Sequence, residues 1–181
     1  NKANYIDAVV EDAVKWWTPY ADMILLIGYG NHETAIIKNL ETDPLQRFAD
    51  LLNMTCKTNV QVGGYGGVIH YQIGLDANNG SGVVMKYYHG FGGGGAVTKG
   101  VIQDQRMMAQ MEGYDIIWMG HVHEMYHHVN MIESYDPNRK EIDHKEVHQL
   151  RTAAYKEEYE DGFGGYHIEK GRPVKPLGGY W

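Results

Sequence analysis

The sequence predicts a mixed α/β fold of the α+β class, in which two β-sheets form a sandwich with helices on the outside. The chain opens with a helical pattern, a short turn and a buried-strand pattern. Together these form the second half of a crossover unit, which favours a parallel sheet. From Val60 onward the pattern changes to strands separated by turn residues, which is typical of hairpins. The two patterns in one chain predict the two-sheet sandwich.

The first elements follow from apolar spacing. One face of a helix collects Ile6, Val9, Val10, Ala13, Val14 and Trp17. This helix should end at Thr18, because the residue before a proline disfavours helical backbone. The apolar run over residues 22–29 predicts a buried strand. A short helix should then begin near Thr34.

A second helix start is predicted at Asp43. Asp43 is a helix-capping residue, Pro44 suits the first helical position, and Gln46 can complete a capping box. Its buried face should contain Leu45, Phe48, Leu51 and Leu52.

Strand patterns dominate the rest of the chain. The dipeptide Asn79-Gly80 predicts a hairpin between two of the strands. We expect strands over residues 68–73, 82–88, 115–119, 124–135 and 141–155, a helix over 97–111, and a loop-rich tail over 156–181.

Bulk composition limits the class of protein. A chain of 181 residues with 43% hydrophobic and 22% charged residues suits one soluble domain, so we expect a single domain over 1–181. The net charge of −7 argues against a broad phosphate-binding surface. Cys56 is the single cysteine, which favours a reducing compartment, and no apolar run reaches 18 residues. We therefore expect a cytoplasmic protein with no membrane partner.

Three predicted strands each run into a glycine with a metal-ligand type of side chain beside it. The first is followed by Gly30-Asn31-His32-Glu33, the second ends at His89-Gly90, and the third is followed by Gly120-His121-Val122-His123. Open α/β sheets place their ligands at the carboxyl ends of strands, and imidazole is the commonest transition-metal ligand. On extended backbone, His121 and His123 would face one cleft.

This ordered set of motifs resembles the calcineurin-like metallophosphoesterases, in particular phage-type members. The family pattern is Asp-x-His, Gly-Asp, Gly-Asn-His-Asp/Glu, a lone His, and Gly-His-x-His. The last three blocks are present over residues 5–155, whereas no aspartate here has a histidine two residues later and Gly-Asp does not occur. The missing blocks come first in the family, so we expect the chain to be the C-terminal portion of a longer protein. Its location would be the host cytoplasm if a phage encodes it.

The resemblance implies a fold, a chemistry and roles for individual residues. The fold would be a four-layer sandwich, and the reaction would be hydrolysis of phosphomonoesters or phosphodiesters by a hydroxide that bridges two divalent metal ions. Asn31, His89 and His121 would bind one ion, and His123 would bind the other. Mn is the first expectation, with Fe, Zn or Ni as alternatives. The substrate could be a nucleotide or a nucleic acid.

The resemblance also implies catalytic roles next to the metals. His32 would face the substrate and protonate the leaving oxygen. Glu33 would accept a hydrogen bond from the other ring nitrogen of His32 and fix its orientation.

Several alternatives remain open at this stage. Taken singly, Asn31 could be a turn residue and His89 a surface histidine. Because two ligand blocks are missing, this chain alone should bind one metal weakly or none and show little activity. A non-catalytic interaction domain with the same fold is the main alternative, and a mononuclear metal hydrolase is the third. No second metal site is expected among His70, His127, His128, His144, His148 and His167.

Overall fold

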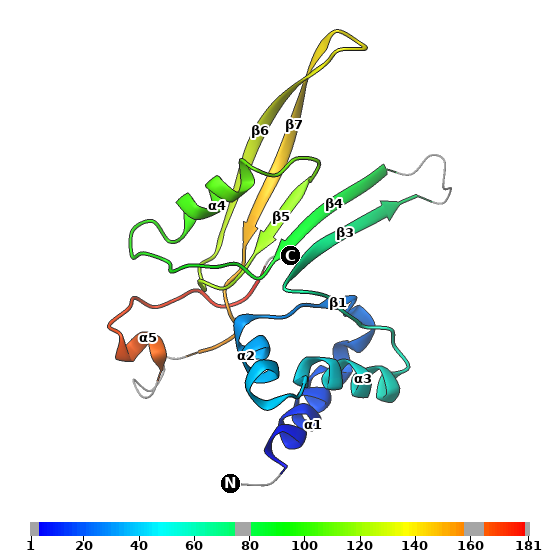
Figure 1. Cartoon of the computed structure of the whole chain (residues 1–181), viewed down its shortest axis with the longest axis vertical. Helices are drawn as coiled ribbons and strands as arrows, with labels where there is room; N and C mark the ends of the chain where they lie inside the picture. The colour runs from blue at the N-terminus through cyan, green and yellow to red at the C-terminus, as the bar shows by residue number, and fades with distance from the viewer. Residues whose placement is uncertain (1–3, 75–80, 158–164, 180–181) are drawn as a thin grey trace. The chain divides into compact units, whose positions relative to one another are not determined.

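The computed structural model describes residues 4–74, 81–157 and 165–179, and the hairpin predicted at Asn79-Gly80 lies outside them. The chain divides into two compact units, Asn1–Gly67 and Val68–Trp181, and each is described by itself. Figure 1 shows both units and labels most of their elements.

The first unit is mainly helical. Its elements are α1 (Tyr5–Trp17), the 3₁₀ helix η1 (Thr18–Met23), β1 (Leu26–Ile27), α2 (Asn31–Leu40), α3 (Pro44–Cys56) and β2 (Gln61–Val62). Strands β1 and β2 pair in parallel. Apolar residues of α1 and α3 supply most of the core, which consists of Val10, Val14, Ala21, Phe48, Leu52 and Val60.

The helix ends of this unit follow the predicted chemistry in part. Asp43 caps α3, since its Oδ1 accepts from the backbone N–H groups of Leu45 at 3.1 Å and Gln46 at 3.0 Å. The side chain of Gln46 donates to Asp50 at 2.8 Å, so the predicted capping box does not form. Helix α2 begins at Asn31 instead of Thr34, because Gly30 takes the extended capping conformation.

The buried strand predicted over residues 22–29 is wrong in its extent. The 3₁₀ helix continues through Met23, and Leu25 is 66% exposed. Only Leu26–Ile27 is extended as a strand, because the pairing partner β2 offers two residues.

The second unit is built on one mixed five-stranded sheet. Its elements are β3 (Gly66–Ile73), β4 (Ser81–Tyr88), α4 (Val101–Met108), β5 (Ile116–Met119), β6 (Tyr126–Asp136), β7 (Glu141–Arg151) and α5 (Tyr166–Glu169). The strand order is β3-β4-β5-β7-β6. Strands β4, β5 and β7 run parallel, and β6 is antiparallel to β7. The chain is therefore a mixed α/β protein of the α+β type.

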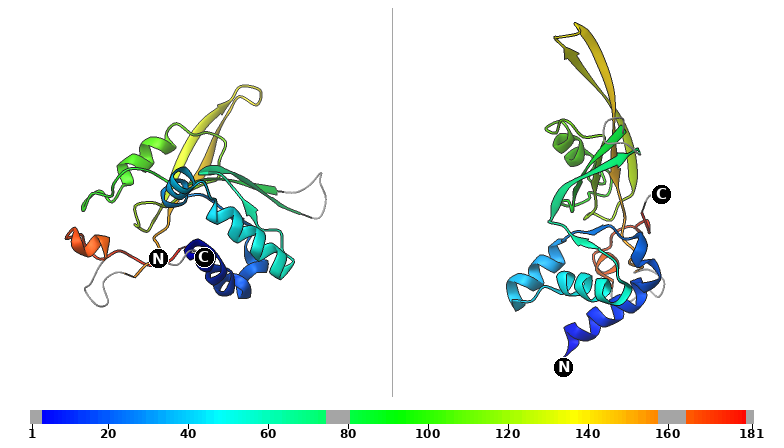
Figure 2. Two further views of the ribbon diagram at one scale, coloured as in Figure 1. Left: turned by 60° about the horizontal axis from the view of Figure 1, so that its bottom comes forward. Right: turned by 90° about the vertical axis from the view of Figure 1, so that its right-hand side faces the viewer.

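Helix α4 covers one face of this sheet (Figure 2). Met108 of α4 packs on Ile117, Met119 and Val147 from the middle strands. The helix is shorter than the predicted 97–111, because Lys99 and Gly100 take left-handed φ angles of 50° and 86° just before it.

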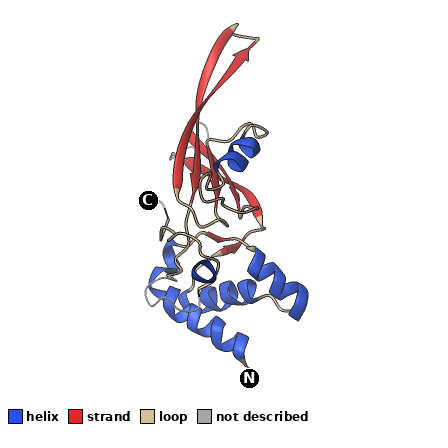
Figure 3. Ribbon diagram, turned by 90° about the vertical axis from the view of Figure 1, so that its left-hand side faces the viewer, coloured by secondary structure: helices blue, strands red, loops and turns tan. Residues whose placement is uncertain are grey.

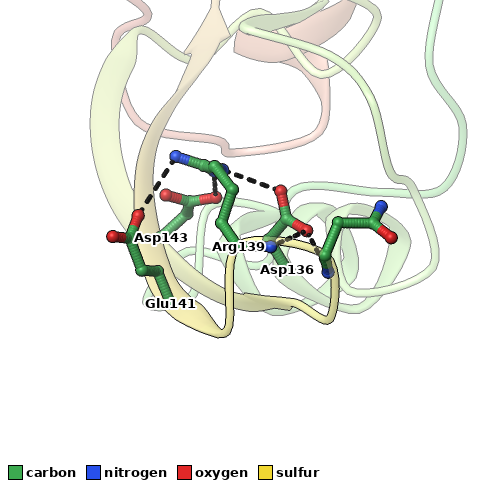
Figure 4. Close-up of polar contacts among 5 residues, drawn as sticks. Asp136, Arg139, Glu141 and Asp143 are labelled. Atoms are coloured by element: carbon green, nitrogen blue, oxygen red, sulfur yellow. Dashed lines mark hydrogen bonds and ion pairs between the residues drawn. The ribbon is translucent and has the colours of Figure 1, made fainter.

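Strands β6 and β7 continue past the short β5 as a two-stranded ribbon (Figure 3). Arg139 closes its tip: Nε donates to Asp136 at 2.8 Å, and the other guanidinium nitrogens contact Glu141 and Asp143 (Figure 4). The side-chain hydrogen bond from Arg139, with the backbone N–H groups of Arg139 and Asn138, lowers the pKa of Asp136 below its ordinary value.

Candidate functional site

The parallel register brings the ends of three strands to one edge of the sheet. Tyr88 of β4 pairs with Met119 of β5, and Met119 pairs with Arg151 of β7. His89 follows the first strand directly, and Gly120-His121 follows the second. Two of the predicted ligand segments therefore leave the sheet next to each other.

Backbone contacts hold these two segments together. The N–H of Gly120 donates to the carbonyl of His89 at 3.1 Å. Gly90 has a φ of 104°, and a Cβ there would lie 3.0 Å from both the Gly120 carbonyl oxygen and the His121 Cβ. Only glycine satisfies both the backbone angle and this close approach.

The imidazoles of His89 and His121 meet at this edge. His121 Nδ1 lies 3.1 Å from His89 Nε2, and the ring centroids are 5.1 Å apart with planes at 71°. Both side chains are half-buried. Two nitrogens bound to one cation at about 2.1 Å with roughly perpendicular bonds lie about 3 Å apart. The pair can thus share a proton in a hydrogen bond or bind a common transition-metal ion.

The segment after β5 is a turn and not the extended backbone that the sequence suggested. His121 and His123 have left-handed φ angles of 70° and 56°, and the N–H of Val122 donates to the Gly120 carbonyl at 2.9 Å. The alternation argument for a shared cleft therefore does not apply to them. His123 instead has its ring 5.3 Å from the ring of His167, in α5, with the planes at 53°.

A buried ion pair braces the Gly120 turn. Arg151 and Asp104 are each 1% exposed, and Arg151 Nε donates to Asp104 Oδ2 at 2.5 Å. A second guanidinium nitrogen donates to Asp104 Oδ1, and the third donates to the Gly120 carbonyl. The Tyr126 hydroxyl also donates to Asp104. Burial raises the pKa of Asp104 above its ordinary value, while the hydrogen bond and charge of Arg151 oppose that rise.

A second ion pair attaches the C-terminal segment beside His123. Glu124, 5% exposed, accepts from Lys175, and Lys99 Nζ lies 4.0 Å from its other oxygen. Ala154 and Leu177 also form a parallel β-bridge. These contacts fix the segment that contains His167.

The other predicted residues belong to the first unit. Asn31 and His32 occupy the first turn of α2 and are exposed, so the amide and imidazole stand at a helix N-terminus. Glu33 Oε2 accepts from the N–H of Gly30 at 2.9 Å, as one half of a capping box. That hydrogen bond uses the carboxylate as a helix cap, whereas the resemblance assigned it to the ring of His32.

A groove of about 570 Å³ also lies in the first unit, between α1 and α3. Its lining includes Asp7, Arg47 and Asp50 and none of the predicted site residues. We therefore place the candidate site at the sheet edge, where imidazoles converge.

Sequence reasoning missed His167, Arg151 and Asp104. Arg151 shares one face of β7 with Val147 and Gln149, and all three are buried, but the polar residues at 149 and 151 give no apolar alternation that would reveal this from the sequence. No local pattern marks His167, which is brought to His123 by the Lys175–Glu124 contact.

At this sheet edge the candidate metal ligands occur in pairs, His89 with His121 and His123 with His167. Within residues 4–74, 81–157 and 165–179, no group of three or more His, Cys, Asp or Glu side chains is arranged to hold an ion. The same ranges contain no helix with the length and apolarity needed to span a bilayer.

In comparisons with known proteins, the chain matches no protein-family model, no curated protein and no solved structure.

Proposed function

We propose that this chain acts in metal-dependent hydrolysis of phosphoester bonds, as a phosphoesterase or as part of one. The observation that supports this most is the 3.1 Å approach of His89 Nε2 to His121 Nδ1. The two residues come from separate motifs, and the parallel strands β4 and β5 bring them to one edge.

His89 and His121 would hold the first divalent ion, and His123 would be a ligand of a second ion. Mn is the first candidate, and Fe, Zn or Ni also suit imidazole ligands. A bound ion supplies polarisation of a phosphoryl oxygen and a hydroxide nucleophile at neutral pH.

The proposal includes the finer fold expectation and the substrate class. The five-stranded sheet would supply one layer of a metallophosphoesterase sandwich. Phosphomonoesters, nucleotides and nucleic-acid phosphodiesters all present the same reacting group to such a site.

Hydrolysis of bis-p-nitrophenyl phosphate with Mn²⁺ tests this proposal. We expect weak activity in the unmodified protein, because two ligand blocks are missing, and a further loss of at least about tenfold in His89→Ala and His121→Ala, because each removes a ligand of the ion. His144→Ala is the matched control, since His144 is exposed on β7 and contacts Glu133 at 3.4 Å. Equal activity in all four proteins would refute the proposal.

One sequence observation favours a second candidate, a non-catalytic interaction domain. The Asp-x-His and Gly-Asp blocks do not occur in the chain, so carboxylates of the family pattern are missing. Metal binding that depends on His89 and His121, without any hydrolysis, would favour this candidate.

A further inference from the structure

We propose that His167 is a metal ligand, and that it forms a second ion site together with His123. This inference rests on the proposed function, because it adds a ligand to the same sheet edge. Nothing in the sequence pattern assigns His167 a role, and it lies in a segment expected to be loop.

The first argument is the burial of an imidazole. His167 is 8% exposed although it belongs to the four-residue helix α5, near the end of the chain. A buried polar side chain must gain from its surroundings what it loses in hydration. Its ring stands 5.3 Å from the ring of His123 and 5.5 Å from that of Tyr166.

The second argument is the geometry of the two histidine pairs. Two imidazoles on one ion, with metal–nitrogen bonds of about 2.1 Å and angles of roughly 95–110°, have ring centroids about 5 Å apart. The centroid distances are 5.1 Å for His89–His121 and 5.3 Å for His123–His167. Both distances are therefore compatible with a shared ion, and the burial of His167 distinguishes the second pair from His127–His148, whose ring centroids are 5.2 Å apart at an exposed site.

The third argument is the short connection between the pairs. His121 and His123 are two residues apart, so their Cα atoms are at most about 7 Å from each other. Two-metal hydrolytic sites hold their ions about 3.5–4 Å apart. This Cα separation is compatible with one ligand on each ion of such a site.

The fourth argument is the way the C-terminal segment is fixed. Glu124 adjoins His123 and holds Lys175, while both side chains are at least nine-tenths buried. Arg172 also lies over the Tyr166 ring at 5.4 Å. The Glu124–Lys175 contact holds the C-terminal segment to the residues after β5, and the Arg172–Tyr166 contact is internal to that segment, so α5 is positioned as pre-organised ligation requires. His167 would then replace a ligand that the missing sequence blocks supply elsewhere.

Titration with Zn²⁺ alone, followed by imidazole ¹⁵N spectra of the unmodified protein, tests the assignment. We expect two bound equivalents, with the ring nitrogens of His123 and His167 shifting together on the second. In His167→Ala the affinity for one ion should fall by at least about tenfold, while the other ion stays bound to His89 and His121. His144→Ala should bind as the unmodified protein does.

The outcomes separate this inference from the proposed function. Unmoved His167 ring signals, with zinc bound through His89 and His121, would overturn the second site and leave the proposed function standing. If the unmodified protein binds no zinc at His89 and His121, both the second site and the proposed function are overturned. Because the ring spectra need no variant, a folding defect in His167→Ala does not affect the test.

Discussion

Arg151 and Asp104 are both buried on folding, so each charge loses its hydration and is stabilised by the other. Replacing Arg151 with Met leaves a buried carboxylate that keeps the hydrogen bond from Tyr126 but loses its charged partner. We expect this change to lower the free energy of unfolding by about 3–5 kcal/mol, measured by urea denaturation.

The double variant Asp104→Leu with Arg151→Met is the control for this pair. It removes both charges together, so most of the lost stability should return. A double variant no more stable than Arg151→Met would show that the pair contributes chiefly through packing and the Gly120 contact.

The hydrogen bond of Tyr29 predicts a loss of stability at alkaline pH. Its hydroxyl donates to Asp43 Oδ2 at 2.5 Å, and this hydrogen bond raises the pKa of Tyr29 from 10.0 to about 12. Because the folded pKa is the higher one, the stabilisation is complete below pH 10 and is lost as the pH rises through 12.

Thermal unfolding between pH 9 and 12 measures this effect. Tyr29→Phe should start less stable and lose less stability over that range. Tyr20→Phe, at an exposed tyrosine of the same unit, should keep the full alkaline loss. Parallel curves for Tyr29→Phe and the unmodified protein would contradict the assignment.

At the scale of elements, Asp115 joins three strands of the sheet. Its Oδ2 accepts from the N–H of Val84 in β4 at 2.7 Å, and its Oδ1 lies 2.8 Å from Lys145 of β7. The hydrogen bond from Lys145, followed by that from Val84, lowers the pKa of Asp115 below 3.8. The carboxylate therefore stabilises the sheet above pH 3.8, and this contribution is lost as the pH falls through the lowered pKa.

Asp115→Asn tests this link by urea unfolding at two pH values. At pH 7 the variant should be less stable by about 1 kcal/mol, because it keeps an acceptor for Val84 but loses the charge that Lys145 contacts. At pH 2 the difference should shrink. An equal difference at both pH values would mean that the charge is not involved.

Element types were predictable where periodicity was strong. Helices α1 and α3 and the strands β4, β5, β6 and β7 lie close to where the sequence predicted them. The predicted apolar face of α1 was wrong in part, because Val9 and Trp17 are 47% and 46% exposed. The strand predicted over 22–29 was wrong in extent because a 3₁₀ helix starts at Thr18-Pro19 and continues through Met23, so the first part of the apolar run is helical. The sequence could not show that the partner strand β2 has two residues.

The candidate site was also predictable only in part. His89 and His121 could be paired in advance, because parallel strands end at one edge. His123 could not, since the left-handed turn after Gly120 breaks the alternation. His167 depends on a contact between segments distant in the sequence, which no local pattern encodes.

At the scale of the whole molecule, each unit has a core of its own. Leu52 in α3 and Ile117 in β5 are both fully buried, in separate clusters. Replacing either with alanine should cost about 2–5 kcal/mol in the unit that contains it.

Amide hydrogen exchange distinguishes the two cores. In Leu52→Ala the amides of α3 should exchange faster while those of β5 keep their rates, and Ile117→Ala should reverse this. Equal acceleration in both elements for one variant would show that the cores unfold as a single cooperative unit.

The left-handed backbone at His121 and His123 favours glycine for stability, whereas metal binding would require the two imidazoles. Glycine relieves that conformation, so His121→Gly or His123→Gly should change stability by about 1 kcal/mol or less, with relief of strain offsetting lost contacts. A directed-evolution library screened for heat resistance alone would thus have little reason to retain either imidazole. Retention of both under a screen for function, and their drift under a screen for melting temperature, would reveal which demand keeps them there.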